Sequence, residues 1–257
     1  MTEQNSNKEK SIPESRNAVI EVRDLKISFG SEPVLNGLSL DLYEGENLVV
    51  LGKSGSGKSV LIKCIVQLLQ ADSGSIKVFG KEMNNIGKKD LEELRKDIGF
   101  LFQSGALYDS MTVRQNLEFP LRRIRKELDE KQIEAKVQEV LDNVGLPDTG
   151  DKMPSQLSGG MKKRIGLART IIVDPKILLY DEPTTGLDPI TSDEISQLMN
   201  AVKKQYKTSS IIITHDIACV KTVADRIIMI NDGILFKEGT YHDFTTSKDP
   251  FIKSYFK

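Results

Sequence analysis

The stretch G-K-S-G-S-G-K-S, from Gly52 to Ser59, decides how the rest of this chain is interpreted. It matches the phosphate-binding pattern G-x-x-x-x-G-K-[ST] at every specified position. Residues 48–51 before it read Leu-Val-Val-Leu, which is typical of a short buried strand, and residues 60–69 after it carry apolar side chains at helical spacing. Strand, glycine-rich loop and helix in this order are the context that a phosphate-binding loop requires, so we expect a nucleotide site here.

Each position of this loop has an expected task. The three glycines let the backbone turn so that successive N–H groups point at phosphate oxygens. We expect the Lys58 ammonium on the β- and γ-phosphates and the Ser59 hydroxyl on Mg²⁺. The predicted nucleotide contacts are Gly52, Lys53, Ser54, Gly55, Ser56, Gly57, Lys58, Ser59 and Val60. A chance glycine-serine turn is the alternative, and the flanking strand and helix argue against it.

Composition narrows the class of protein. At 257 residues the chain is long enough for one domain with insertions. Lysine and arginine total 36 against 37 for aspartate and glutamate, so we expect no nucleic-acid partner. Residues 1–17 lack the apolar core of a secretory signal, and no apolar run approaches the roughly 20 residues that span a bilayer. Cys64 and Cys219 lie in apolar helical contexts typical of buried free thiols. These features favour a soluble protein of a reducing compartment, such as the cytoplasm.

Hydrophobic patterning predicts an α/β fold with an inserted helical region. Residues 1–17 are expected to be a disordered tail. Short apolar segments separated by turn residues predict an antiparallel sheet, with strands at 19–22, 25–29, 38–42 and 75–79. Apolar strands of the nucleotide-binding core are expected at 98–102, 177–180 and 211–213, and helices at 88–96 and 162–173.

The region 104–157 is predicted to be a mostly helical insertion into that core. Its first part, 104–125, looks irregular, with Gly105, Pro120 and several apolar residues. Residues 129–144 form a well-marked amphipathic pattern that begins with a capping box and ends before a glycine.

Two acidic residues follow the strand predicted at 177–180. Asp181 is placed to hold Mg²⁺ together with Ser59, because an ion bound through a hydroxyl needs an acidic partner. Glu182 would then lie near the γ-phosphate, where a carboxylate can accept a proton from an attacking water. A strand-terminating turn is the alternative for this pair, and the phosphate-binding loop elsewhere in the chain favours catalysis.

A second anion site is predicted where Leu-Ser-Gly-Gly-Met, residues 157–161, opens a helix. A serine and two glycines at a helix start offer a hydroxyl, unobstructed N–H groups and the positive end of the helix dipole. The alternative is a good helix cap with glycines required by close packing, and this would be preferred if the motif stood alone.

Two rings complete the set of candidates. Phe29 could be a platform on which an adenine stacks, although a lone aromatic at this place is more often a core or edge residue. His215 follows the strand predicted at 211–213, and alone it would more often be a satisfied histidine beside a strand end.

Taken together, these segments resemble the nucleotide-binding subunits of ABC transporters. They occur in that family's order and approximate spacing over about residues 19–239, namely the loop at 52–59, Gln103, L-S-G-G-M at 157–161, I-L-L-Y-D-E-P at 177–183, Gly186-Leu187-Asp188 and Thr214-His215-Asp216. The resemblance implies an ATPase with ATP and Mg²⁺ as cofactors. It also implies a P-loop NTPase core of the RecA type with an antiparallel β-subdomain and an α-helical subdomain at about 104–157. This nucleotide-binding domain would span residues 18–239, followed by a C-terminal extension at 240–257.

The resemblance also implies roles for individual residues. Gln103 would sense Mg²⁺ and the helical insertion, and His215 would contact the γ-phosphate and join Lys58 and Glu182 as a catalytic residue. The signature residues Ser158, Gly159 and Gly160 would meet the γ-phosphate held by a second copy of the chain. Asp188 would take part in the contact between the two copies.

Two positions depart from the family pattern. Met161 replaces the usual glutamine of the signature, and Phe29 replaces the usual aromatic hydroxyl residue of the adenine platform. Neither change removes a phosphate ligand, and stacking needs only the ring.

The methionine points to a narrower resemblance. L-S-G-G-M together with F-L-F-Q-S-G-A-L-Y-D-S-M-T-V at 100–113 and D-P-I-T at 188–191 looks like the ATPases of Mla-type lipid transporters. This resemblance implies a homodimer formed on ATP binding, an integral-membrane permease and a lipid-binding protein of the mammalian-cell-entry (MCE) type. It places the subunit on the cytoplasmic face of the inner membrane as a peripheral protein.

The same residues argue against several other functions. A DNA-repair or translation ATPase of this family would show a long coiled-coil insertion or a second cassette, and the chain has room for neither. A GTPase should carry an [NT]-K-x-D motif downstream of the loop, and none is found. A non-catalytic module would be expected to lose Lys58 or Glu182. An ABC importer or exporter of another small solute remains the serious alternative.

Overall fold

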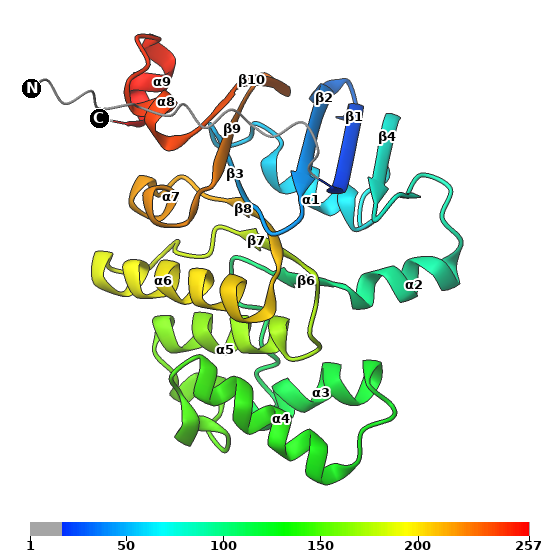
Figure 1. Ribbon diagram of the computed structural model, residues 1–257, viewed down its shortest axis with the longest axis vertical. Coiled ribbons are helices and arrows are strands. Elements are labelled where there is room, and N and C mark those ends of the chain that lie inside the picture. Colours follow the sequence, from blue (N-terminus) through cyan, green and yellow to red (C-terminus); the bar gives the residue numbers. More distant parts are fainter. Residues whose placement is uncertain (1–16, 257) are drawn as a thin grey trace, which may run out of the picture.

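Two β-sheets organise the computed structural model, which describes residues 17–256 (Figure 1). A four-stranded sheet has the strand order β2-β1-β4-β5, and a six-stranded sheet has the order β10-β9-β3-β8-β7-β6. The predicted α/β class, with an antiparallel sheet beside the core sheet, is confirmed. The tail predicted at residues 1–17 lies outside the described residues except for Asn17.

The smaller sheet contains β1 (Ala18–Phe29), β2 (Glu32–Tyr43), β4 (Ser73–Val78) and β5 (Lys81–Glu82), all paired antiparallel. The segments predicted as separate strands at 19–22 and 25–29 are one continuous strand. Asp24 has a left-handed φ of 47°, and the pairing register shifts between Val22 and Leu25. This irregularity leaves Val22 and Leu25 both fully buried, which explains why the alternation is interrupted in the sequence.

The larger sheet contains β3 (Asn47–Gly52), β6 (Ile98–Leu101), β7 (Ile177–Asp181), β8 (Ser209–Ile213), β9 (Arg226–Asn231) and β10 (Ile234–Gly239). The pair β9–β10 is antiparallel and the other neighbours are parallel. Strands β3, β7 and β8 are buried along their whole length, which explains the apolar runs at 48–51, 177–180 and 211–213. Because these strands are parallel, the chain segments that follow them meet at one edge of the sheet.

Helices cover both faces of this sheet (Figure 1). The helices of residues 17–256 are α1 (Lys58–Ile65), α2 (Lys88–Lys96), α3 (Val113–Ile124), α4 (Glu130–Asn143), α5 (Gly159–Ile171), α6 (Pro189–Tyr206), α7 (Ile217–Val223), α8 (Tyr241–Thr245) and α9 (Pro250–Tyr255), with 3₁₀ turns at Pro147–Thr149 and Pro154–Gln156. Helices α3 and α4 pack on α5 and lie away from the sheet (Figure 1). Leu48 and Val50 of β3 join one core with α1 and the smaller sheet, whereas Val49 and Leu51 join the other with α3 to α7. The amphipathic helix predicted at 129–144 is confirmed as α4, and both cysteines are buried as predicted.

The expectation of irregular structure over 104–125 is wrong for its second half, which forms α3. A capping box starts this helix: the Thr112 hydroxyl accepts from the Gln115 N–H at 3.2 Å, and Gln115 Oε1 accepts from the Thr112 N–H at 2.9 Å. Pro120 lies inside the helix and removes one internal hydrogen bond. Burial of the apolar face against the core stabilises the helix in spite of that loss.

Two other helices differ in extent from their predictions. The helix after the phosphate-binding loop ends at Ile65 rather than near residue 69, because Gln67 adopts a left-handed φ of 55°. Helix α5 begins at Gly159 rather than at residue 162, since the Ser158 hydroxyl already caps it by accepting from the Met161 N–H at 3.3 Å.

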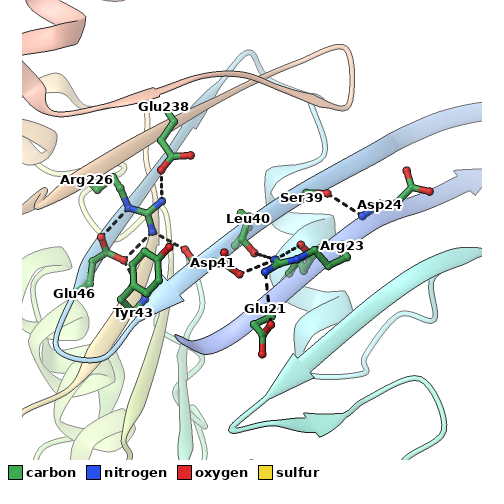
Figure 2. A network of polar contacts seen from close by, with 11 residues as sticks. Glu21, Arg23, Asp24, Ser39, Leu40, Asp41, Tyr43, Glu46, Arg226 and Glu238 are labelled. Atoms are coloured by element: carbon green, nitrogen blue, oxygen red, sulfur yellow. Dashed lines mark hydrogen bonds and ion pairs between the residues drawn. The ribbon is translucent and has the colours of Figure 1, made fainter. Parts of the chain in front are cut away.

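A buried ion network joins the two sheets (Figure 2). Arg226 of β9 donates two hydrogen bonds to the Glu46 carboxylate, one to each oxygen and each 2.8 Å long. It also donates to the Glu238 carboxylate of β10 at 2.6 Å. Its guanidinium also lies 5.0 Å from the centroid of the Tyr43 ring at the end of β2. The network fixes the turn from β2 into β3, and β3 leads into the phosphate-binding loop.

Candidate active site

The phosphate-binding loop begins at Gly52, the last residue of β3, and runs through Gly57 into Lys58 and Ser59, the first two residues of α1. Gly57 has a φ of 91°, and a Cβ there would lie 2.9 Å from the carbonyl oxygen of Val34. A Cβ on Gly52 would lie 2.6 Å from the carbonyl oxygen of Ile230. Close packing therefore requires glycine at both positions, and α1 presents its first N–H groups at the end of the loop.

Lys58 is folded back over the loop that precedes it. Its Nζ donates to the carbonyl oxygens of Gly52 and Lys53, each at 2.8 Å. Burial lowers the pKa of the Lys58 ammonium, and the nearby carboxylates of Glu182 and Asp181 act in the opposite direction. The cation is thus held among carbonyl and carboxylate oxygens, and phosphate oxygens can replace the two carbonyls as its partners.

Ser59 and Asp181 are in contact although they are 122 residues apart in the sequence. Ser59 Oγ donates to Asp181 Oδ1 at 2.9 Å. Hydroxyl and carboxylate oxygens are the hard ligands that Mg²⁺ accepts, together with phosphate oxygens and water, so this pair fits an ion that arrives with a nucleotide. Within residues 17–256 no group of three or more His, Cys, Asp and Glu side chains could hold a metal by itself.

Glu182 directly follows β7 and has a φ of 50°, which non-glycine residues rarely adopt. Its Oε2 lies 2.8 Å from His215 Nδ1 and accepts a hydrogen bond from Thr185 Oγ1 at 3.0 Å. The Glu182 side chain is 16% exposed and the His215 side chain 66% exposed. Two side chains therefore fix the Glu182 carboxylate, which is largely shielded from solvent. A carboxylate in such a position can accept a proton from the water that attacks the γ-phosphate.

Most of these residues line one cavity of about 580 Å³; Asp181 does not line it but contacts Ser59, which does. It is lined by Val34, Gly52, Ser54, Gly55, Gly57, Lys58, Ser59, Val60, Gln103, Glu182, Thr185, His215 and Tyr255. Gln103 follows β6, so the ends of β3, β6, β7 and β8 all contribute to the cavity. The structure thus brings the loop, Gln103, Glu182 and His215 together at one cavity, and their roles toward a nucleotide stay predictions.

Sequence reasoning missed three of the lining residues, Val34, Thr185 and Tyr255. The hydroxyl of Thr185, three positions after Glu182, is a signal that could have identified it. Val34 comes from β2 and Tyr255 from α9, and neither belongs to a recognisable motif. In α9, the Phe251 ring centroid lies 5.0 Å from Lys53 Nζ, so the C-terminal extension packs against the phosphate-binding loop.

Phe29, Lys53 and Ser56 were predicted to contact the nucleotide but are not among the cavity's lining residues. Phe29 is 51% exposed at the end of β1. Lys53 is directed to the Phe251 ring, and the buried Ser56 hydroxyl lies beside Gly52, where a Cβ would come within 2.5 Å of it. Their contacts with a nucleotide stay predictions.

The signature residues also lie outside the cavity, at the start of α5. Ser158 and Gly159 are exposed. A Cβ on Gly160 would lie 2.6 Å from Thr191 Cγ2, so close packing requires this glycine. Asp188 caps α6: it accepts from the N–H groups of Ile190 and Thr191, and the Thr191 hydroxyl bond lowers the pKa of its carboxyl group.

Comparison with known proteins identifies the family. The family model described as "ABC transporter" matches residues 35–185. The chloroplastic protein TRIGALACTOSYLDIACYLGLYCEROL 3 of Arabidopsis thaliana is 38% identical over 265 residues, covering 96% of this chain and 76% of the relative. The chain belongs to the ABC transporter family.

Other relatives and solved structures agree with this assignment. The probable ribonucleotide transport ATP-binding protein mkl of Mycobacterium leprae is 40% identical, covering 92% of this chain and 68% of the relative. The methionine import ATP-binding protein MetN of Clostridium tetani is 39% identical, covering 88% of this chain and 70% of the relative. The ATP-binding cassette MJ0796, solved as a dimer in a post-hydrolysis state with ADP and Pi, superposes with a TM-score of 0.78 at 29% identity, covering 86% of this chain and 98% of that chain.

These comparisons make the chain an ABC ATPase subunit of a transporter, with the P-loop NTPase fold and with ATP and Mg²⁺ as its cofactors. They agree with the geometry of the site, in which the phosphate-binding loop lines the cavity together with Glu182 and His215, and the loop's Ser59 hydroxyl bonds to Asp181. Over residues 17–256, no helix combines the length and the apolar character needed to cross a membrane.

Proposed function

We propose that this ABC ATPase powers lipid movement through a separate membrane permease, at the cytoplasmic face of the inner membrane. The observation that carries this proposal is the position of Gln103. It lines the nucleotide cavity and directly precedes a segment that bears exposed aromatic side chains. Movement of Gln103 when the γ-phosphate is bound or lost can therefore shift the exposed segment that directly follows it.

In the proposed reaction, Lys58 binds the β- and γ-phosphates. Ser59 and Asp181 would hold Mg²⁺, and Gln103 would sense the ion. The magnesium ion supplies charge stabilisation on the phosphate oxygens when it is bound. Glu182 accepts the proton of the attacking water, and His215 contacts the γ-phosphate from the exposed side.

We infer that two copies of the chain share each nucleotide. The start of α5 offers N–H groups and the Ser158 hydroxyl, but it lies outside the cavity and is open to solvent. A second chain can therefore bring its own Ser158, Gly159 and Gly160 onto the nucleotide, with Asp188 near the contact. The dimeric state of the related cassette supports this arrangement.

Sharing of the site predicts that specific activity depends on protein concentration. We expect phosphate release per subunit to rise with concentration in the dilute range and then level off, because dissociated chains lack half of each site. A specific activity that stays constant down to a concentration at which light scattering finds only single chains would argue for a self-contained site.

The proposed permease contact is an exposed aromatic pair near Gln103. Tyr108 is 42% and Phe119 40% exposed, and their ring centroids lie 5.3 Å apart. Backbone groups of Tyr108 are held by the Asn116 side chain, and the Arg169 guanidinium lies 4.9 Å from the Tyr108 ring. The ring is thus fixed in place while remaining open to a partner, which is the usual character of a docking surface. Its proposed occupant is a short cytoplasmic helix of the permease.

Tyr108→Asp is expected to leave ATP binding by the purified subunit unchanged and to release the subunit from its membrane complex. The substitution puts a charge into a contact that must lose water on docking. The measurement is co-purification of the permease with the tagged subunit from detergent-solubilised membranes, beside the ATP affinity of the same preparation.

Ile234→Asp is the matched control, because Ile234 is 44% exposed on β10 and lies outside the proposed contact. The control should stay in the complex. The docking assignment is wrong if the Tyr108 variant remains bound with normal transport, or if it melts well below the parent protein.

The same preparation tests the substrate class. L-S-G-G-M at 157–161 and the relative named for a trigalactosyldiacylglycerol support a lipid. The relative named for methionine import supports the alternative, an importer of a small solute. We expect an MCE-type lipid-binding protein and bound phospholipid to accompany the permease. Recovery of a permease with a solute-binding protein and without lipid would favour the alternative.

A further inference from the structure

Lys163 is a buried lysine of α5 that the proposed reaction does not use. The residue is 7% exposed. Its Nζ donates to the backbone carbonyl of Glu182 at 3.2 Å and, at shorter range, to the backbone carbonyl of Gln103. These carbonyls belong to the segments that follow β7 and β6, so one ammonium joins two walls of the nucleotide cavity.

Two further contacts of α5 are with the segment that follows Gln103. A Cβ on Gly166 would lie 3.0 Å from the carbonyl oxygen of Gly105, and Arg169 Nη1 donates to the carbonyl oxygen of Ala106 at 2.9 Å. Helix α5 is therefore packed closely along residues 103–106. Lys163 extends this contact to the backbone of Glu182.

A cation at this position is costly to bury. Burial lowers the pKa of the Lys163 ammonium, while the carboxylates of Glu182 and Asp181 favour its charged form. A neutral side chain of similar length would avoid the desolvation cost but would lose the charge-assisted bonds to both carbonyls. The geometry therefore indicates a residue that fixes the relative position of the segments it joins.

We propose that Lys163 is a positioning residue for ATP hydrolysis, which holds the backbone of Glu182 in a fixed place relative to Gln103 and to α5. The inference rests on the proposed role of Glu182 as the proton acceptor. Ser158 caps the same helix only five positions before Lys163, so a rigid helix links the signature residues to the catalytic carboxylate. Docking of a second chain at the start of α5 would therefore affect the position of the Glu182 carboxylate.

The test is Lys163→Met, which keeps the length of the side chain and removes its donors. We expect kcat for ATP hydrolysis to fall about 10- to 100-fold, because a small misplacement of a catalytic group costs that much. ATP affinity should stay within about threefold, since Lys163 does not line the cavity. Lys163→Arg keeps a charged donor and should restore most of kcat. The control is Lys204→Met on the exposed surface of α6, which should leave kcat unchanged.

A second comparison separates positioning from a general structural role. Placed in a Glu182→Gln background, Lys163→Met should cause no further loss of the residual hydrolysis, because both changes act through the same carboxylate. Should Lys163→Met fail to fold, Lys163→Gln is measured against the same expectations.

The proposal is overturned by kcat within about twofold of the parent, by an equal loss of ATP affinity, by failure of Lys163→Arg to restore turnover, or by additive losses in the Glu182→Gln background. Normal hydrolysis by Glu182→Gln alone would instead refute the assignment of the base. That result is distinguishable because it does not involve Lys163.

Discussion

Glu182→Gln is expected to bind ATP and Mg²⁺ normally and to hydrolyse ATP about 100- to 10,000-fold more slowly than the parent protein. Glutamine has the shape of glutamate and still accepts the hydrogen bond from Thr185, but its neutral amide is a poor proton acceptor. The measurement is phosphate release at saturating ATP, with ATP affinity determined on the same preparation.

Glu134→Gln is the matched control, because Glu134 is exposed on α4 away from the cavity. It should retain full turnover. Near-normal turnover of Glu182→Gln would move the proton acceptor elsewhere. His215 would then be the next candidate, since its Nδ1 lies 2.8 Å from Glu182 Oε2 in the same cavity.

Lys58→Ala is expected to abolish tight ATP binding, with a loss on the order of 10- to 100-fold or more, because a charge-assisted phosphate contact is removed. The fold should survive, since the Lys58 ammonium bonds only to carbonyls of its own loop among the contacts of the described chain. We expect the melting temperature to fall by no more than a few degrees, as for a loss of about 1 kcal/mol. Equilibrium titration with ATP and thermal unfolding check the two parts.

Lys63→Ala removes the same charge from the last turn of α1 and is the matched control. Its ATP affinity should be that of the parent protein. If Lys58→Ala binds ATP as tightly as the parent, the assignment of the nucleotide site to Gly52–Ser59 is wrong.

The parts of the site that the sequence could predict are those that a local pattern requires. Strand, glycines, lysine and hydroxyl must follow one another for a backbone to surround phosphate groups, so the loop is recognisable without a structure. Asp181 and Glu182 are recognisable for a similar reason, because a buried strand that ends in carboxylates beside such a loop has few other uses. The central strands were equally clear, since burial on both faces leaves a continuous apolar run.

What escaped prediction depends on contacts between distant parts of the chain. Helix α3 lies in a stretch that looks irregular because Pro120 interrupts it, and burial against the core decides its structure. Tyr255 lines the cavity because α9 packs beside it, and no local sequence pattern predicts that packing. In the sequence, Lys163 cannot be told apart from the adjacent Lys162. Only its hydrogen bonds to the carbonyls of Gln103 and Glu182, which the packing of α5 allows, distinguish the two lysines.

The most direct test of the central claim, an ATP site shared between two chains, is the mass of Glu182→Gln in solution with saturating ATP and Mg²⁺. Because this variant is expected to bind ATP normally and to hydrolyse it about 100- to 10,000-fold more slowly, the shared site should persist. Light scattering is predicted to give twice the mass of a single chain with ATP and the mass of one chain with ADP. The mass of one chain in ATP, at protein concentrations where the parent enzyme is fully active, would contradict the account.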